Sequence, residues 1–328
     1  MNSQMAFGAS FLASLATTPC AVVVAIRLGI TDKPGPLKVQ TAAVPYLGGL
    51  AMLLAIAWPL GVVRPVLLLP AGLAAGLGLV DDVAAISARV RLALEFAVGI
   101  ISGLVVTCPP GGIFGVLLTA LIVVGLVNAV NLIDGLDGLA SGTALMVAVS
   151  FAIYGGGGRQ IAFITAGALC GFLLFNRPPA RIYLGDSGSY LLGVLIAILG
   201  VSALDNPGGA TSWAVVPLFV AVPVLDTAVA ITRRAIARRP LFLGDRSHVY
   251  DQLVDRGLGR GQSVLVMISL QACISAFGLL VPKRHSVLAF GVLGGVVFLL
   301  ALVVVFGGFV TPVHRAGSVS PDSERSKE

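Results

Sequence analysis

Apolar stretches long enough to cross a lipid bilayer recur along the whole of this 328-residue sequence. A hydrocarbon core about 30 Å thick needs roughly 20 consecutive apolar residues in a helix. The spans must be helices, because backbone groups in lipid have no water to bond. Only 11% of the residues are charged, against about 25% in soluble domains. The chain has too little polar surface to face water on all sides, and we expect an all-α polytopic membrane protein.

We expect about eleven transmembrane helices, separated by Gly, Pro or charge clusters. The expected ranges are 4–26, 44–63, 65–80, 92–108, 112–132, 139–155, 160–175, 188–204, 212–231, 262–281 and 286–310. They form one multi-span domain over residues 1–312. The remaining residues, 313–328, are rich in Ser and charge, and their composition is typical of a disordered tail.

The distribution of charge predicts the orientation, because cytoplasmic loops of membrane proteins carry an excess of Lys and Arg. Most of the 21 Lys and Arg residues fall in one set of loops and in the C-terminal tail. This places the N-terminus outside and the C-terminus in the cytoplasm. The rule does not constrain acidic residues, yet all 15 except Asp205 follow the basic ones. We therefore expect an active-site cleft on the cytoplasmic face.

A first polar cluster, G-L-V-D-D-V at residues 78–83, lies where the third span meets the cytoplasm. Two adjacent carboxylates, Asp81 and Asp82, are costly at the end of a span unless they are solvated, paired or metal-bound. A solvated helix end is the structural alternative. Acids do not supply the usual positive anchor, so the pair favours a functional role.

A second cluster, N-A-V-N-L-I-D-G-L-D-G at residues 128–138, ends the fifth span. Asn128, Asn131 and Asp134 recur every three residues, which predicts that they share one helix face. Asp137 follows between two glycines that let the backbone approach a ligand. Helix capping explains one such residue but not four, so function is favoured.

A third cluster, F-N-R-P-P-A-R-I-Y-L-G-D-S-G-S at residues 175–189, precedes the eighth span. Arg181 offers a planar fork suited to phosphate. Asp186 stands between glycines, in a turn that presents a carboxylate beside free helix N–H groups. An ordinary N-cap is the alternative for Asp186.

A fourth cluster is the arginine-rich loop from Arg233 to Arg260. Its positive charge attracts phosphates or anionic lipids. Within it, D-R-S-H-V-Y-D-Q-L starts like a helix capped by Asp245 or Ser247. His248 lies beside Arg246 at this helix start, where a functional and a structural role are equally favoured.

The four clusters supply carboxylate and amide oxygens with arginines and few histidines. These groups suit Mg²⁺, or Mn²⁺ in its place, and phosphates better than zinc. Glycine-rich P-loop and Rossmann fingerprints are absent from the sequence. A nucleotide diphosphate would therefore be bound by a fold of another kind.

These four motifs, in this order, resemble the polyprenyl-phosphate N-acetylhexosamine-1-phosphate transferase family. The stretches N-L-I-D-G-L-D-G and P-A-R-I-Y-L-G-D-S-G-S carry the likeness. Two stretches are closer to the GlcNAc-1-phosphate branch than to the muramoyl-pentapeptide branch. They are N-L-I-D-G-L-D-G-L-A and P-V-L-D-T…R-R. The resemblance implies an Mg²⁺-dependent phosphotransferase that moves a sugar-1-phosphate from a UDP-sugar to a polyprenyl phosphate and releases UMP.

Chemistry and resemblance together predict the site. The expected catalytic residues are Asp81, Asp82, Asp134, Asp137 and His248, the substrate-binding residues Asn128, Arg181 and Arg246, and the metal ligands Asn131 and Asp186. One motif departs from the family, whose last loop is written H-x-H-H in the GlcNAc branch. Here it is His248-Val249-Tyr250-Asp251, so contacts to the donor sugar, uridine or phosphate are expected to differ.

The expected partners are a polyprenyl phosphate acceptor, a UDP-sugar donor and membrane lipids, with no nucleic acid. The sequence leaves open whether the protein forms a homodimer. The main rival to an enzyme is an ion-coupled lipid or sugar transporter, which places ionisable groups near mid-membrane. No expected span carries a charge near its centre, which disfavours transport. A muramoyl-pentapeptide-type transferase and an inactive homologue remain as alternatives.

Overall fold

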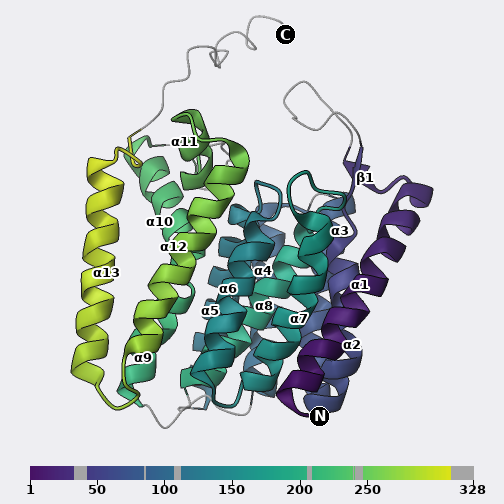
Figure 1. Cartoon of the computed structure of the whole chain (residues 1–328), viewed down its shortest axis with the longest axis horizontal. Helices are drawn as coiled ribbons and strands as arrows, with labels where there is room; N and C mark the ends of the chain where they lie inside the picture. Colours follow the sequence, from purple (N-terminus) through teal and green to yellow (C-terminus); the bar gives the residue numbers. More distant parts are fainter. Residues whose placement is uncertain are drawn as a thin grey trace, which may run out of the picture.

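The computed structural model describes residues 1–32, 43–84, 86–106, 112–204, 209–238, 240 and 247–311. It is a bundle of helices that run side by side between two ends (Figure 1). The expectation of an all-α polytopic membrane protein is confirmed. Asp245, Arg246 and the tail 313–328 lie outside the described residues.

The helices follow one another along the chain. They are α1 (Ser3–Leu28), α2 (Gly48–Val63), α3 (Leu68–Ala84), α4 (Ala88–Val105), α5 (Ile113–Ile133), α6 (Leu139–Tyr154), α7 (Arg159–Asn176), α8 (Gly185–Leu204), α9 (Ala210–Phe219), α10 (Ala221–Ile236), α11 (Val249–Asp255), α12 (Arg260–Leu280) and α13 (Ser286–Phe306). A 3₁₀ turn, Pro65–Leu67, leads into α3. Two short strands, β1 (Thr31–Asp32) and β2 (Val44–Pro45), pair antiparallel.

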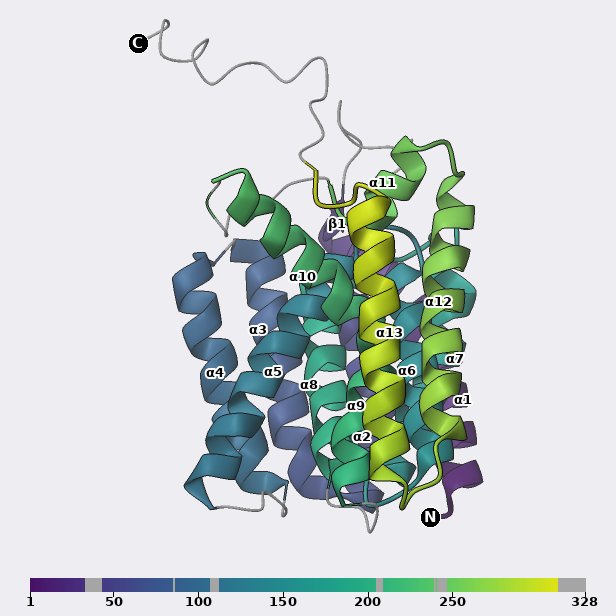
Figure 2. The same cartoon turned by 90° about the vertical axis from the view of Figure 1, so that its left-hand side faces the viewer.

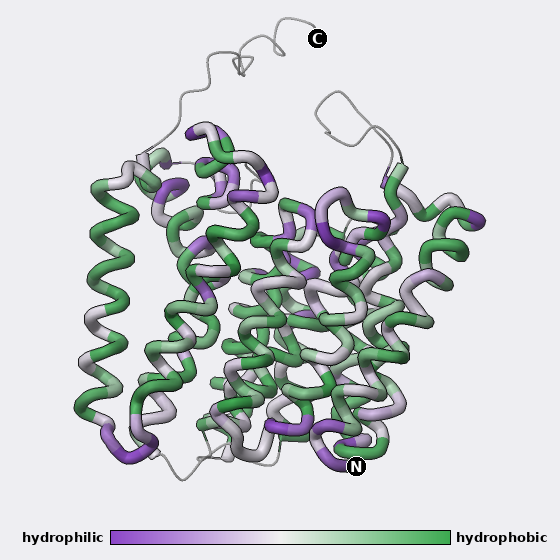
Figure 3. Tube along the Cα trace, in the orientation of Figure 1, coloured by the Kyte–Doolittle hydropathy of each residue, from purple (hydrophilic) through white to green (hydrophobic). Residues whose placement is uncertain are grey.

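A helix occupies every range expected to span the membrane. Among the described residues, seven helices are long and apolar enough to cross a bilayer, or eight if α9 and α10 count as one bent span. The hydropathy trace has an apolar middle and hydrophilic residues gathered toward the two ends (Figure 3). This is the pattern of a multi-pass membrane protein.

The ninth expected span, 212–231, is broken rather than continuous: α9 and α10 meet at an angle of 71°. Gln271 of α12 satisfies the backbone groups that the break releases. Its Oε1 accepts from the N–H of Val222 at 2.9 Å, and its Nε2 donates to the carbonyls of Leu218 and Phe219 at 3.2 and 3.0 Å. A break inside a bilayer needs such partners, because no water reaches the released groups.

Helix α8 is the core of the bundle, and nearly all of its residues are buried. It packs against α2, α3, α5, α6 and α7. Small residues allow this close packing: a Cβ on Gly193 would lie 2.4 Å from the Cα of Val127 on α5. Helices in membranes associate through such contacts, because lipid gives no hydrophobic drive between them.

The polar ends of α3, α5 and α8 meet at one end of this bundle, where Asp82 of α3 and Asn131 of α5 bond to the first turn of α8. Helix α11 and strand β1 lie at one common end of the molecule (Figures 1 and 2). The turned view also shows α11 beside the ends of α12 and α13 (Figure 2).

Candidate active site

The first turn of α8 is held by a carboxylate from another helix. The Oδ1 of Asp82, in the last turn of α3, accepts from the N–H of Asp186 at 2.9 Å, and its Oδ2 accepts from the N–H of Ser187 at 3.1 Å. The first N–H groups of a helix have no partner within it. Because Asp82 caps α8, and α8 begins at Gly185 rather than at the expected residue 188, the alternative that Asp186 is the N-cap is wrong.

Two glycines let neighbouring backbones touch this turn. A Cβ on Gly49 of α2 would lie 2.2 Å from the backbone nitrogen of Gly188. A Cβ on Gly78 of α3 would lie 2.3 Å from the carbonyl oxygen of Asp186. Both distances are far inside van der Waals contact. Only glycine fits at these two positions, and their backbones fix where Asp186 lies.

Asn131 of α5 contacts the same turn. Its Nδ2 donates to Oδ1 of Asp186 at 2.6 Å and to Oγ of Ser189 at 3.2 Å. The predicted metal ligands Asn131 and Asp186 are therefore neighbours. In the described residues, the amide oxygen of Asn131 and Oδ2 of Asp186 take no part in these bonds.

Asp134 and Asp137 follow the end of α5. Asp134 is the C-cap residue. It keeps some contact with solvent, yet burial raises the pKa of its carboxyl to about 8, and the charges of Asp186, Asp82 and Asp137 act in the same direction. Oδ2 of Asp137 accepts from the backbone N–H of Ala180 at 2.9 Å. Asp134 is thus part of one group of carboxylates, the acid cluster, which consists of Asp81, Asp82, Asp134, Asp137 and Asp186. Asp137 also holds the loop before α8.

Asp81 faces a different set of groups from its neighbour Asp82. Its Oδ2 accepts from the hydroxyl of Tyr190 at 2.6 Å, and its Oδ1 accepts from the N–H of Ile86 at 2.8 Å. The guanidinium of Arg91 on α4 lies 3.6 Å from Oδ2. Sequence reasoning did not single out Tyr190 or Arg91, because nothing in the spacing links them to Asp81.

Asn128 and Asn131 contact different neighbours, although they lie only three residues apart on α5. Nδ2 of Asn128 donates to Oε2 of Glu95 on α4 at 2.5 Å, whereas Asn131 faces α8. Three residues advance a helix by about 300°, so the two side chains differ by roughly 60° about the axis. That angle directs them to different neighbours. Glu95 also lies 3.7 Å from Arg91, so Asn128 belongs to the ion-pair network behind the cluster.

The remaining predicted residues have separate surroundings. Arg181 is exposed in the loop before α8, and Arg246 lies outside the described residues. His248 is buried at the start of α11, with its Nδ1 2.7 Å from Oδ2 of Asp226 on α10. The N-cap residue of this helix is His248 rather than the expected Ser247, and the N–H of Val249 donates to Asp226, which is remote in sequence.

The described residues of this site do not form a ready-made metal cage. Across the described ranges, no set of three or more His, Cys, Asp or Glu side chains is arranged to hold a metal ion. Mg²⁺ usually binds one or two carboxylates together with substrate phosphates and water. The oxygens of Asn131 and Asp186 fit that kind of open site.

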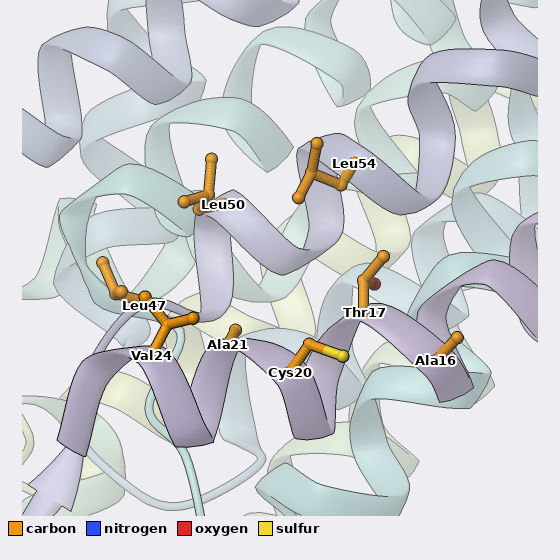
Figure 4. Close-up of a pocket in the computed structure, with 8 residues that line it drawn as sticks. All are labelled: Ala16, Thr17, Cys20, Ala21, Val24, Leu47, Leu50 and Leu54. Carbon is orange, nitrogen blue, oxygen red and sulfur yellow. The ribbon is translucent and has the colours of Figure 1, made fainter. Parts of the chain in front are cut away.

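One cavity lies away from the acids. It has a volume of about 240 Å³ and is bounded by α1 and α2 residues, Thr17, Cys20, Leu50 and Leu54 among them (Figure 4). The Thr17 hydroxyl donates to the carbonyl of Ala51, so its polar group is satisfied. The cavity is an apolar groove and carries no chemistry.

Several proteins are similar to this chain over most of its length. The chain is 32% identical over 295 residues to a Bacillus subtilis (strain 168) protein named probable undecaprenyl-phosphate N-acetylglucosaminyl 1-phosphate transferase, covering 80% of each. This chain belongs to glycosyl transferase family 4. The profile of that family matches residues 64–204.

Other relatives of this family-4 chain have names of the same kind. Identity is 31% over 323 residues with the decaprenyl-phosphate N-acetylglucosaminephosphotransferase of Mycobacterium tuberculosis (strain ATCC 25618 / H37Rv), covering 82% of this chain and 80% of the relative. It is 26% over 306 residues with the undecaprenyl-phosphate alpha-N-acetylglucosaminyl 1-phosphate transferase of Escherichia coli (strain K12), covering 85% and 83%.

The region matched by the family-4 profile runs from the start of α3 to the end of α8. It contains the acid cluster from Asp81 to Asp186. Asp226 and His248 lie beyond it. Asp226 falls in the P-V-L-D-T stretch, which the sequence offered only as a branch signature, so its contact with His248 is visible in the structure alone.

Proposed function

We propose that this protein transfers N-acetylglucosamine-1-phosphate from a UDP-sugar to a polyprenyl phosphate and releases UMP, as the first membrane step of a cell-envelope glycan. The names of the relatives support the lipid acceptor and the transferred group. The observation that carries the proposal is the meeting of Asp82, Asn131 and Asp186, from α3, α5 and α8, in a chain of glycosyl transferase family 4.

We propose that this site lies on the cytoplasmic side of a bacterial inner membrane and that about eleven helices cross that membrane. The excess of Lys and Arg on one side supports the orientation. It is also consistent with α1 beginning at the opposite end of the bundle from the end of α13 (Figure 1). The soluble UDP-sugar would then reach the site from the cytoplasm.

The reaction joins two anions, so positioning and neutralisation of charge should supply most of the rate. A phosphate monoester has its second pKa near 6 and is mostly dianionic at neutral pH. The attacking lipid phosphate therefore needs little help from a base. Both carboxylates of the acidic pair already accept internal hydrogen bonds, Asp81 from Tyr190 and Ile86, and Asp82 from α8. This supports a positioning role for the pair.

Asn131 and Asp186 are the residues that would hold Mg²⁺, or Mn²⁺ in its place. When bound, the metal would neutralise charge on the pyrophosphate and on the leaving UMP. Arg91 and the exposed Arg181 are cations available for charge-assisted bonds to phosphate. Arg91 is already oriented toward the acids by Asp81 and Glu95.

The proposal is tested by incubating purified protein with Mg²⁺, polyprenyl phosphate and a panel of UDP-sugars, and by measuring UMP. We expect UMP release only when both lipid acceptor and UDP-GlcNAc are present. Release with UDP-muramoyl-pentapeptide instead would assign the other branch. A folded protein that releases no UMP with any donor would overturn the transferase proposal.

Metal binding is expected to strengthen as the pH rises toward 8. Asp134 is mostly protonated below its pKa of about 8, and a proton on this carboxyl removes a negative charge beside Asp186. The apparent affinity for Mn²⁺ should fall by up to about tenfold per pH unit below 8. Electron paramagnetic resonance of Mn²⁺ titrated into the nucleotide-free protein measures this.

Asp134→Asn is the control for this titration, because asparagine does not take up a proton in this range. The variant should bind Mn²⁺ with a much flatter dependence on pH. An equally steep dependence in the variant would assign the titration to another group.

A further inference from the structure

Asp226 and His248 form a buried pair that joins α10 to α11. The side chain of Asp226 is 1% exposed and that of His248 is 5% exposed. One carboxylate makes two bonds: Oδ2 lies 2.7 Å from Nδ1 of His248, and Oδ1 accepts from the N–H of Val249 at 2.7 Å. Because both of these bonds are short and come from one carboxylate, Asp226 fixes the orientation of the His248 ring as well as the start of α11.

The hydrogen-bonding inventory decides which atom carries the proton. An ionised carboxylate can only accept, and Asp226 already accepts from a backbone N–H. With Asp226 as the acceptor, we assign the proton to Nδ1 of His248, which then donates to Oδ2. Nε2 is then the ring nitrogen left for any other partner.

His248 is also tied to the segment that carries the acid cluster. Its ring is stacked on Tyr250, with centroids 5.4 Å apart and planes 5° apart. The Tyr250 hydroxyl donates to the carbonyl of Leu132 at 3.2 Å, and the ring packs so closely that a Cβ on Gly135 would lie 2.0 Å from that hydroxyl. One aromatic ring thus separates the imidazole from residues 131–135.

We propose that Asp226 is a positioning residue for the transfer reaction: it holds His248 with the proton on Nδ1, so that the lone pair of Nε2 is presented to an O–H group of the substrates. This inference rests on the proposed function. It explains why a carboxylate is kept buried in the broken α9–α10 span, where an acid is costly. It also gives the histidine that remains in the H-V-Y-D loop a defined role.

A purely structural clamp makes a different prediction, and Asp226→Asn separates the two. Asparagine has nearly the same shape, and its oxygen can still accept from Val249. Its amide nitrogen, however, donates toward Nδ1, which must then accept. The clamp would survive, while the proton on His248 would move to Nε2.

The tautomer can be read directly. The chain has three histidines, so His285→Gln with His314→Gln leaves His248 alone. In ¹⁵N-histidine spectra of this protein in lipid, we expect the proton on Nδ1, and in the added Asp226→Asn variant on Nε2. A proton on Nε2 with Asp226 intact would overturn the proposal, whatever the activity is.

Activity supplies the second readout. Asp226→Asn should lower kcat for UMP release by roughly 10²-fold, the scale of a lost acid–base contact, with a small change in KM and thermal stability. In a His248→Gln background the same change should cost no more than about twofold, because it acts through the ring. Equal losses in both backgrounds would show that Asp226 does not act through His248. The expected tautomer and double-mutant results, obtained with substrates other than a UDP-sugar and a polyprenyl phosphate, would support the positioning role of Asp226. They would overturn the proposed function.

Discussion

Asp186→Asn is expected to lower the rate of UMP release by about 10²–10³-fold, the scale of losing one preorganised electrostatic contact. Asp186 lies where α3, α5 and α8 meet, and its carboxylate accepts from Asn131. Asparagine removes the negative charge and places an amide beside another amide. Steady-state assays over a range of Mg²⁺ should show a raised metal requirement together with the fall in kcat.

The charge-matched control is Asp255→Asn, at the exposed end of α11. It also removes one negative charge from the protein, yet it should change the rate by less than twofold. Thermal unfolding of both variants in detergent should stay close to that of the parent. An Asp186→Asn protein with near-parental kcat would exclude Asp186 from the site.

Gly78→Ala is the second change with a large expected effect. Its Cβ would lie 2.3 Å from the carbonyl oxygen of Asp186 and 2.5 Å from the Cα of Ser187. These are backbone atoms of the first turn of α8, which cannot rotate aside. The helices must separate, at a cost of about 1–3 kcal/mol or more for overpacking. We expect a lower unfolding temperature and loss of activity, because Asp186 moves with the turn.

Gly76→Ala, two residues earlier on α3, is the matched control. Nothing lies within 4 Å of a Cβ built there. It should leave activity unchanged and leave the unfolding temperature the same or slightly higher, since alanine favours helix by about 1 kcal/mol over glycine. If both variants behave alike, the contact between α3 and α8 is not tight in solution.

Hydropathy alone located the helices, and the reason is physical. A span must be apolar over a length set by the bilayer, so consecutive residues are enough to predict it. The exception is the break between α9 and α10. It is stabilised by Gln271, some 50 residues further along, as judged from its bonds to Leu218 and Phe219.

The candidate site was predicted in part for a similar reason. The motifs gave the residue types and the end of each helix at which they lie, and the family resemblance implied that Asn131 and Asp186 both lie near Mg²⁺. They did not give the rotation of each helix about its axis. That rotation sends Asn128 to Glu95 instead of to the cluster.

The sequence by itself determined that this chain is a multi-pass helical membrane protein with carboxylates, amides and arginines at helix ends, because bilayer thickness and motif chemistry act on consecutive residues. Only the tertiary structure decided how those groups are used. Asp82 caps α8, Tyr190 and Arg91 hold Asp81, and Asp226 holds His248. These partners are distant in sequence and meet only when backbone contacts, such as that at Gly78, set the spacing of the helices.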